Sequence, residues 1–240
     1  MIQISTHIYC DPLFENIEIE NKLLPSQYKE YPYLIIKNFF SQEACKELAS
    51  LVQEDEETKR KAKVKKEVFS GIVQAGIVEE YRKTNIYELD TFYHNYYDEQ
   101  FSKYQPIIEE YFNVALTLST DVQVLEYKKG FFYVKHADDS SEIIDKEERT
   151  IGFKSVAPQR KLSTVLFATS HVSKTDGKGL SFSGGELMFN YLYDKCGEAV
   201  KIRPEAGDMI IFPSNPYFSH EVLPVDEGYR LTLVQWHDTI

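Results

Sequence analysis

A histidine and an aspartate stand two residues apart, at 136 and 138, directly after the aromatic and apolar run FFYVK. Side chains at positions i and i+2 of an extended chain point to the same side. His136 and Asp138 can therefore converge on one metal ion, whereas Asp139 would point away. The tripeptide alone is weak evidence, because short patterns of this kind recur by chance on protein surfaces.

A second imidazole is available from His220, which lies 84 residues further along in the segment IFPSNPYFSHEVLPV. Two imidazoles and one carboxylate on one face of an octahedron leave three positions open, which is the arrangement of non-haem Fe(II) oxygenases. Neutral imidazole also binds zinc, so the ligand types leave the metal open. Taken alone, His220 is better explained as an ordinary hydrogen-bonded histidine.

A third group of residues stands in the run YRLTLVQW, where Arg230 and Thr232 share one face with Val234 and Trp236. The opposite face is formed by leucines, so Arg230 would point into the interior of a barrel. A buried arginine requires an anionic partner, and its guanidinium matches a carboxylate through two parallel hydrogen bonds. The alternatives are an exposed arginine on an edge strand, or one paired with a protein carboxylate.

The elements that must position these residues are short strands, which follow one another after residue 120. Gly, Asp, Asn or Pro separates most of them, a pattern that predicts a sandwich or barrel and not a βαβ sheet. We expect strands at 121–128, 131–136, 161–170, 186–193, 198–204, 207–213 and 229–236. The gaps at 139–160 and 171–185 are long and polar, so we expect structureless loops there that act as lids or binding loops.

Before residue 120 the apolar residues recur mostly at helical spacing, which predicts helices. Residues 41–55 begin with a serine that can cap a helix and carry an apolar stripe. Residues 91–113 place aromatic side chains mostly at helical spacing, and Pro106 is expected to kink or split that helix. The charged run 54–66 is expected to be a solvated face or a mobile loop. We expect one domain over 1–240, in which 1–120 is a helical support and 121–240 is the jelly-roll core.

Composition narrows the class of protein further. Hydrophobic residues make up 42% of the chain, which excludes a disordered protein, and the formal net charge of −11 disfavours nucleic acid as a partner. Three scattered cysteines without a CxxC motif suggest neither a disulfide framework nor a thiolate zinc site. Neither a signal peptide nor a membrane-spanning run is evident, so a cytoplasmic protein is the default expectation.

The order of these motifs resembles the 2-oxoglutarate- and Fe(II)-dependent oxygenases, and within them the prolyl 4-hydroxylase type. VQVLEYKKGFFYVKHAD is similar to that family's strand, turn and strand entering the metal site. RKLSTVLFAT followed by FSGGELMF resembles its central strands, and RPEAGDMIIFPSNPYFSHEVLPVDEGYRLTLVQW resembles its closing segment. The resemblance implies a double-stranded β-helix (jelly roll) packed against helices.

The resemblance also implies a role for each site residue. His136, Asp138 and His220 fall on the iron ligands, and Arg230 falls on the residue that pairs with the distal carboxylate of 2-oxoglutarate. Thr232 would assist Arg230, and Tyr127 falls on a tyrosine whose hydroxyl reaches the same carboxylate. A core aromatic is the alternative for Tyr127. Fe(II) and 2-oxoglutarate are the implied cofactor and cosubstrate, with ascorbate as a reductant.

The implied reaction is hydroxylation of an amino-acid side chain, with succinate and carbon dioxide as coproducts. A prolyl residue in a protein or peptide is the first candidate on family grounds. Hydroxylation of a free amino acid or another small molecule is an alternative. A further alternative is a metal-binding jelly roll without catalysis, because fold does not determine function. Neither the substrate nor the oligomeric state can be read from the sequence.

Overall fold

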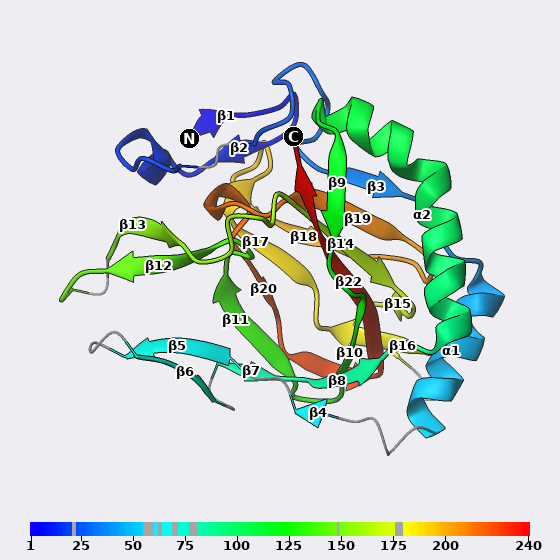
Figure 1. The fold of residues 1–240 in the computed structure, drawn as a ribbon. Helices are drawn as coiled ribbons and strands as arrows, with labels where there is room; N and C mark the ends of the chain where they lie inside the picture. The colour runs from blue at the N-terminus through cyan, green and yellow to red at the C-terminus, as the bar shows by residue number, and fades with distance from the viewer. Residues whose placement is uncertain are drawn as a thin grey trace.

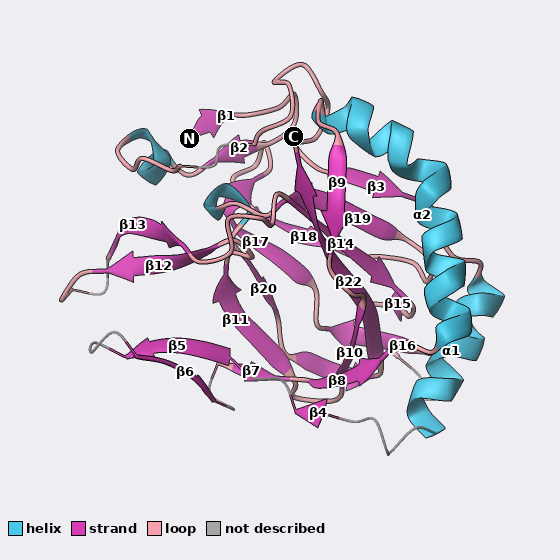
Figure 2. Ribbon diagram, viewed as in Figure 1, coloured by secondary structure: helices cyan, strands magenta, loops and turns pink. Residues whose placement is uncertain are grey.

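A computed structural model describes residues 1–20, 23–54, 81–147, 149–175 and 180–240, together with the backbone of three short strands between 60 and 76. These residues form mainly antiparallel strands and two long helices, α1 (Gln42–Glu54) and α2 (Thr91–Phe112), which lie along one side of the molecule (Figures 1 and 2). Short 3-10 turns are η1 (Pro12–Glu15) and η2 (Pro216–Phe218). Within the described residues, no helix is long and apolar enough to cross a membrane.

The larger sheet has the strand order β3-β19-β14-β22-β10-β8-β4, and β9 also pairs with β22. Its central strands β14 and β19 are buried along their whole length, since both faces of this part of the sheet are covered. The bounds are β3 (Leu34–Ile36), β4 (Arg60–Lys61), β8 (Asn85–Glu88), β9 (Leu116–Ser119), β10 (Gln123–Tyr127), β14 (Leu162–Phe167), β19 (Met209–Pro213) and β22 (Arg230–Thr239).

The smaller sheet has the order β1-β2-β17-β20-β11-β7, and β18 pairs with β17. Its bounds are β1 (Ile2–Gln3), β2 (Tyr9–Cys10), β7 (Arg82–Lys83), β11 (Phe132–His136), β17 (Leu187–Tyr193), β18 (Ala199–Ile202) and β20 (His220–Val222). Three minor groups complete the described strands: β5 (Val64–Val68) with β6 (Ile72–Gly76), β12 (Ser140–Ile144) with β13 (Thr150–Ser155), and β15 (Ser170–His171) with β16 (Ser181–Gly184) and β21 (Val225–Gly228).

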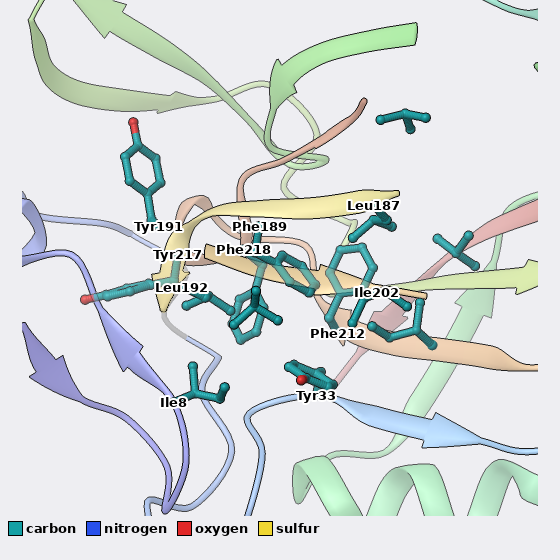
Figure 3. Packing of buried hydrophobic residues seen from close by; sticks show 14 of the residues in the cluster. Ile8, Tyr33, Leu187, Phe189, Tyr191, Leu192, Ile202, Phe212, Tyr217 and Phe218 are labelled. Carbon is teal, nitrogen blue, oxygen red and sulfur yellow. The ribbon is translucent and has the colours of Figure 1, made fainter. Parts of the chain in front are cut away.

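Two apolar cores hold these layers together. One core lies between the two sheets and includes Phe189, Phe212 and Phe218, shown from close by in Figure 3. The other lies between the larger sheet and the helices and contains Leu231 and Leu233. Alternate residues of β22 therefore enter different cores, as the period of two in YRLTLVQW predicted. This architecture confirms the jelly roll packed against helices.

The strands predicted after residue 120 are all present, as β10, β11, β14, β17, β18, β19 and β22. The first predicted helix is α1, and the Ser41 hydroxyl accepts a hydrogen bond from the backbone N–H of Ala44, as a helix cap does. Residues 1–120 are less helical than the sequence predicted, because strands β1 to β9 also lie there. The charged run 54–66 falls, beyond Glu54, on residues whose side chains are outside the described part of the chain.

Two expectations were wrong in part. Pro106 does not split the second helix, since α2 runs through it to Phe112. Both halves of α2 bury aromatic or aliphatic side chains, such as Tyr97 and Ile108, and this burial outweighs a proline cost of about 3 kcal/mol. The gaps 139–160 and 171–185 are not structureless, because they contain the β12–β13 hairpin and strands β15 and β16; residues 176–179 lie outside the described part.

Candidate active site

The two predicted histidines face each other across neighbouring strands of the smaller sheet. His136 is the last residue of β11 and His220 the first of β20, and the antiparallel register pairs them directly. Their ring centroids are 4.3 Å apart. The 3-10 turn η2, capped by the Asn215 side chain, delivers the chain into β20 at this point. Residues 84 positions apart in the sequence thus become immediate neighbours.

Both imidazoles are oriented by backbone carbonyls. Nδ1 of His136 lies 2.9 Å from the carbonyl oxygen of Val134, and Nδ1 of His220 lies 3.0 Å from that of Phe218. A carbonyl can only accept, so Nδ1 carries the proton in each ring and Nε2 keeps its lone pair. Burial and the neighbouring His220 lower the pKa of His136, which favours the neutral form that metal ligation requires.

Asp138 completes a group of three possible metal ligands. Its Oδ1 lies 3.8 Å from Nε2 of His136, and the ligand atoms of His136, Asp138 and His220 all lie within 4.8 Å of one another. Burial alone would raise the pKa of Asp138, but the two imidazoles and the Ser163 hydroxyl lower it below its usual value, so the carboxylate is ionised. In the part of the chain that the structure describes, no other such group of three occurs.

The second oxygen of Asp138 is held by two buried serines. Ser163 Oγ lies 2.6 Å from Asp138 Oδ2 and 2.8 Å from Ser214 Oγ. Because an ionised carboxylate only accepts hydrogen bonds, Ser163 must donate to Asp138 and Ser214 must donate to Ser163. Oδ2 is thereby engaged and Oδ1 faces the imidazoles. Asp139 points elsewhere, as expected: it accepts from the Ser140 hydroxyl at 2.6 Å, and burial raises its pKa to about 6.

Arg230 lies inside the barrel, 1% exposed, beside the ring of Tyr127. Its guanidinium carbon is 4.7 Å from the Tyr127 ring centroid and 5.2 Å from that of Phe167. The cross-strand register of β10 and β22 pairs Tyr127 with Arg230. Thr232, equally buried two residues along, accepts a long 3.4 Å hydrogen bond from the Arg230 guanidinium.

The charge of Arg230 has no protein counter-ion within the described residues, and its Nε has no hydrogen-bond partner. Burial lowers the pKa of Arg230 to about 10, so the group still carries its charge at neutral pH. An unpaired charge of this kind is costly to bury unless a ligand completes it. The Arg230 guanidinium thus keeps an unused donor in a buried position beside Thr232 and the Tyr127 ring. The alternatives of an exposed or protein-paired Arg230 are therefore wrong.

Sequence reasoning missed several residues around the three candidate ligands. Tyr133 stacks on His136 with ring centroids 3.7 Å apart, and the guanidinium carbon of Arg82 lies 4.5 Å from the same tyrosine ring. Arg160 lies 3.9 Å from the centroid of the Trp236 ring. Tyr133 and His136 share a side only because the strand is irregular between them, so the period of two gave no signal. Ser163, in contrast, was visible as a polar residue in an apolar strand.

A cavity of about 610 Å³ opens elsewhere on the barrel and contains none of the predicted site residues. It is lined by the segment around Tyr31 and Tyr33, by Tyr111 of α2, and by residues near β18 and β19. Phe167, which lines this cavity, also lies 5.2 Å from the guanidinium carbon of Arg230, measured to its ring centroid.

Comparisons with known proteins agree with this geometry. Residues 122–238 match the family model of the 2OG-Fe(II) oxygenase superfamily, and no curated protein matches the chain. A prolyl-4-hydroxylase from Pseudomonas putida has a similar structure, with a TM-score of 0.54 and 19% identity over 86% of this chain and 91% of that one. A viral collagen prolyl hydroxylase from Paramecium Bursaria Chlorella virus-1, in complex with 2-oxoglutarate, gives 0.55 and 19% over 87% and 96%.

A prolyl hydroxylase from Trichoplax adhaerens, in complex with a hypoxia inducible factor peptide fragment, gives a TM-score of 0.52 and 18% identity over 86% of this chain and 83% of that one. At these identities the likeness shows the fold. The family match over the jelly roll shows in addition that the enzyme is a dioxygenase that requires Fe(II) and 2-oxoglutarate. Residues 122–238, which include the His-Asp-His group, thus match the 2OG-Fe(II) oxygenase superfamily.

Proposed function

We propose that the protein hydroxylates an amino-acid side chain, first of all a prolyl residue in a protein or peptide, and converts 2-oxoglutarate and dioxygen to succinate and carbon dioxide. The observation that carries the proposal is the position of two aromatic side chains beside the candidate iron ligands. Tyr133 stacks on His136, and Trp236 pairs across β14 and β22 with Ser163, which holds Asp138. Aromatic side chains at this place would give an apolar wall to the pyrrolidine ring of a prolyl residue, which has no hydrogen-bond donor to satisfy.

In this proposal His136, Asp138 and His220 hold Fe(II). The donor set fits the ion, because two neutral imidazoles and one carboxylate leave three coordination positions open. An ion held there would keep positions available for 2-oxoglutarate and for the dioxygen chemistry that it would supply. The serine contact to Asp138 Oδ2 supports binding through a single carboxylate oxygen, which keeps the third position free. Bound iron supplies the dioxygen chemistry, and the chain supplies geometry and exclusion of water.

Arg230, Thr232 and Tyr127 are proposed to hold the distal carboxylate of 2-oxoglutarate. The unpaired, buried guanidinium supports this assignment, because a carboxylate would supply its missing counter-ion. Phe167 and Phe182 surround the same guanidinium and would keep water away from the ion pair. A buried ion pair of this kind also fixes the orientation of the cosubstrate relative to the iron.

The proposal is tested with the protein loaded anaerobically with Fe(II) and 2-oxoglutarate and then exposed to air with a panel of proline-containing peptides and free amino acids. We expect substrate-dependent succinate and a gain of one oxygen atom on a prolyl residue of at least one peptide. If only a free amino acid gains an oxygen atom, that amino acid is the substrate and a peptide is not. Iron binding without substrate-dependent succinate for any compound would favour a binding module.

A further inference from the structure

Two arginines next to the candidate metal centre have no acidic partner among the residues that the structure describes. Arg82 belongs to β7 and Arg160 precedes β14, and the Nε atom of each is buried without a hydrogen-bond partner. Neither side chain takes part in an ion pair with any described residue. Both residues are partly exposed, so a ligand that arrives from solvent can reach them. Each therefore presents donors that the described protein leaves unused.

Aromatic rings hold both guanidinium groups in place. Arg82 pairs with Tyr133 in the register of β7 and β11, and its guanidinium carbon lies 4.5 Å from the Tyr133 ring, which itself stacks on His136. Arg160 lies 3.9 Å from the ring of Trp236 and donates from Nη1 to the carbonyl of Asp138 at 3.2 Å. Stacking occupies the flat face of a guanidinium and leaves most of its N–H edge free for a planar anion.

The two charges act on one region. Arg82 contacts the Tyr133 ring that stacks on His136, and Arg160 donates to the backbone of Asp138, so both charges lie beside the same pair of candidate ligands. The chain has 38 acidic residues against 27 lysines and arginines, so carboxylates are abundant. Arg149 pairs with Asp145 and Glu147 at 2.6 Å. Arg82 and Arg160 thus form a pair of positive charges without an acidic partner among the described residues. Such a pair beside the metal centre would attract the carboxylate of a substrate.

We propose that the substrate carries a carboxylate close to the residue that is hydroxylated, and that Arg82 and Arg160 bind this carboxylate. The inference rests on the proposed function and adds the substrate class to it. The carboxylate has two possible sources, an Asp or Glu side chain next to the target residue or the α-carboxylate of a terminal or free amino acid. Both present the same planar anion to the two guanidinium groups, and a peptide series separates them.

The test measures peptide affinity as well as turnover. Three amidated peptides contain one proline flanked by Glu, by Gln or by Lys, and a fourth ends in proline with a free carboxylate. Binding is measured by calorimetry on the anaerobic protein loaded with Mn(II) and 2-oxoglutarate, and kcat and KM on the Fe(II) enzyme. We expect the Glu peptide or the free-carboxylate peptide to bind at least about tenfold more tightly than the Gln peptide. The Lys peptide should bind least, and the advantage should decrease with added salt.

The variants Arg82→Gln and Arg160→Gln should each remove most of that advantage, whereas Arg82→Lys and Arg160→Lys should keep part of it. Arg149→Gln is the matched control, since Arg149 is already paired, and should leave it unchanged. Equal affinity for the Glu, Gln and free-carboxylate peptides overturns the proposal, as does an advantage that survives in the Arg82→Gln, Arg160→Gln double variant. Selective binding without hydroxylation would uphold the carboxylate site and contradict the proposed function.

Discussion

Ser163 donates a 2.6 Å hydrogen bond to Oδ2 of Asp138, and the serine itself is fully buried. The contact joins the central strand β14 of the larger sheet to the loop that follows β11 in the smaller sheet. It therefore fixes one candidate iron ligand to the other half of the barrel. The carboxylate that it holds would otherwise be free to rotate and to offer both oxygens to a metal.

From this contact we predict that Ser163→Ala lowers Fe(II) affinity by about 10–100-fold, the usual effect of removing a residue that orients a ligand. Ser163→Thr keeps the hydroxyl and should retain most of the affinity. Metal affinity is measured by anaerobic titration, and circular dichroism checks the fold. If Ser163→Ala binds iron as tightly as the parent while remaining folded, the serine does not orient Asp138.

The three candidate ligands are predicted to act together. Replacing any one of them by alanine should abolish turnover and sharply reduce bound iron, because it removes one of the three ligands. The variants are His136→Ala, Asp138→Ala and His220→Ala. The fold should survive, since these side chains line a site and contribute little to the apolar cores. Metal content and circular dichroism are measured on the same samples. Full iron occupancy in the His220→Ala variant would contradict the assignment.

His237 makes the stability of the protein sensitive to acid. It is buried between Ser119 and Thr164, its ring stacks on Phe101, and burial lowers its pKa to about 4. In the unfolded chain the pKa of a histidine is about 6.5. Between about pH 4 and pH 6.5 the unfolded chain therefore binds more protons at this residue than the folded chain does. The free energy of unfolding should thus fall as the pH drops from about 6.5 towards 4. The loss from this residue is at most about 3 kcal/mol.

Chemical unfolding of the parent and of His237→Gln at several pH values isolates this effect. The comparison is necessary because Asp139, whose pKa burial raises, contributes the opposite slope below pH 6. The difference in stability between parent and variant should shrink as the pH falls through the window. A difference that stays constant from pH 7 to pH 4 would show that His237 is not held neutral.

The sequence predicted the candidate ligands because their signals are local. An i, i+2 pair such as His136 and Asp138, or Arg230 and Thr232, needs only strand alternation to share a side. Tyr133, Arg82 and Arg160 were missed because their positions depend on an irregular strand and on pairing between distant segments. The spacing of residues along the chain does not report such register.

The same limit explains the fold predictions that failed. Residues 139–160 look polar, yet they form a hairpin because Glu142 accepts hydrogen bonds from Lys135 at 2.7 Å and from Tyr191 at 2.8 Å. Phe153, paired with Glu142 across the hairpin, stacks near Phe14 of the N-terminal segment. Partners that lie so far away in the sequence turn an apparent loop into ordered strands.

Calorimetry of 2-oxoglutarate binding to the anaerobic metal-loaded protein measures whether Arg230 anchors the cosubstrate. Arg230→Ala should weaken binding by about 2–5 kcal/mol, roughly thirty-fold to a few thousand-fold, with far less effect on iron affinity. Arg230→Lys should recover part of the loss, and Thr232→Val should cost only about 1–2 kcal/mol. If Arg230→Ala binds 2-oxoglutarate as tightly as the parent, the buried guanidinium is not the anchor and the site assignment is contradicted.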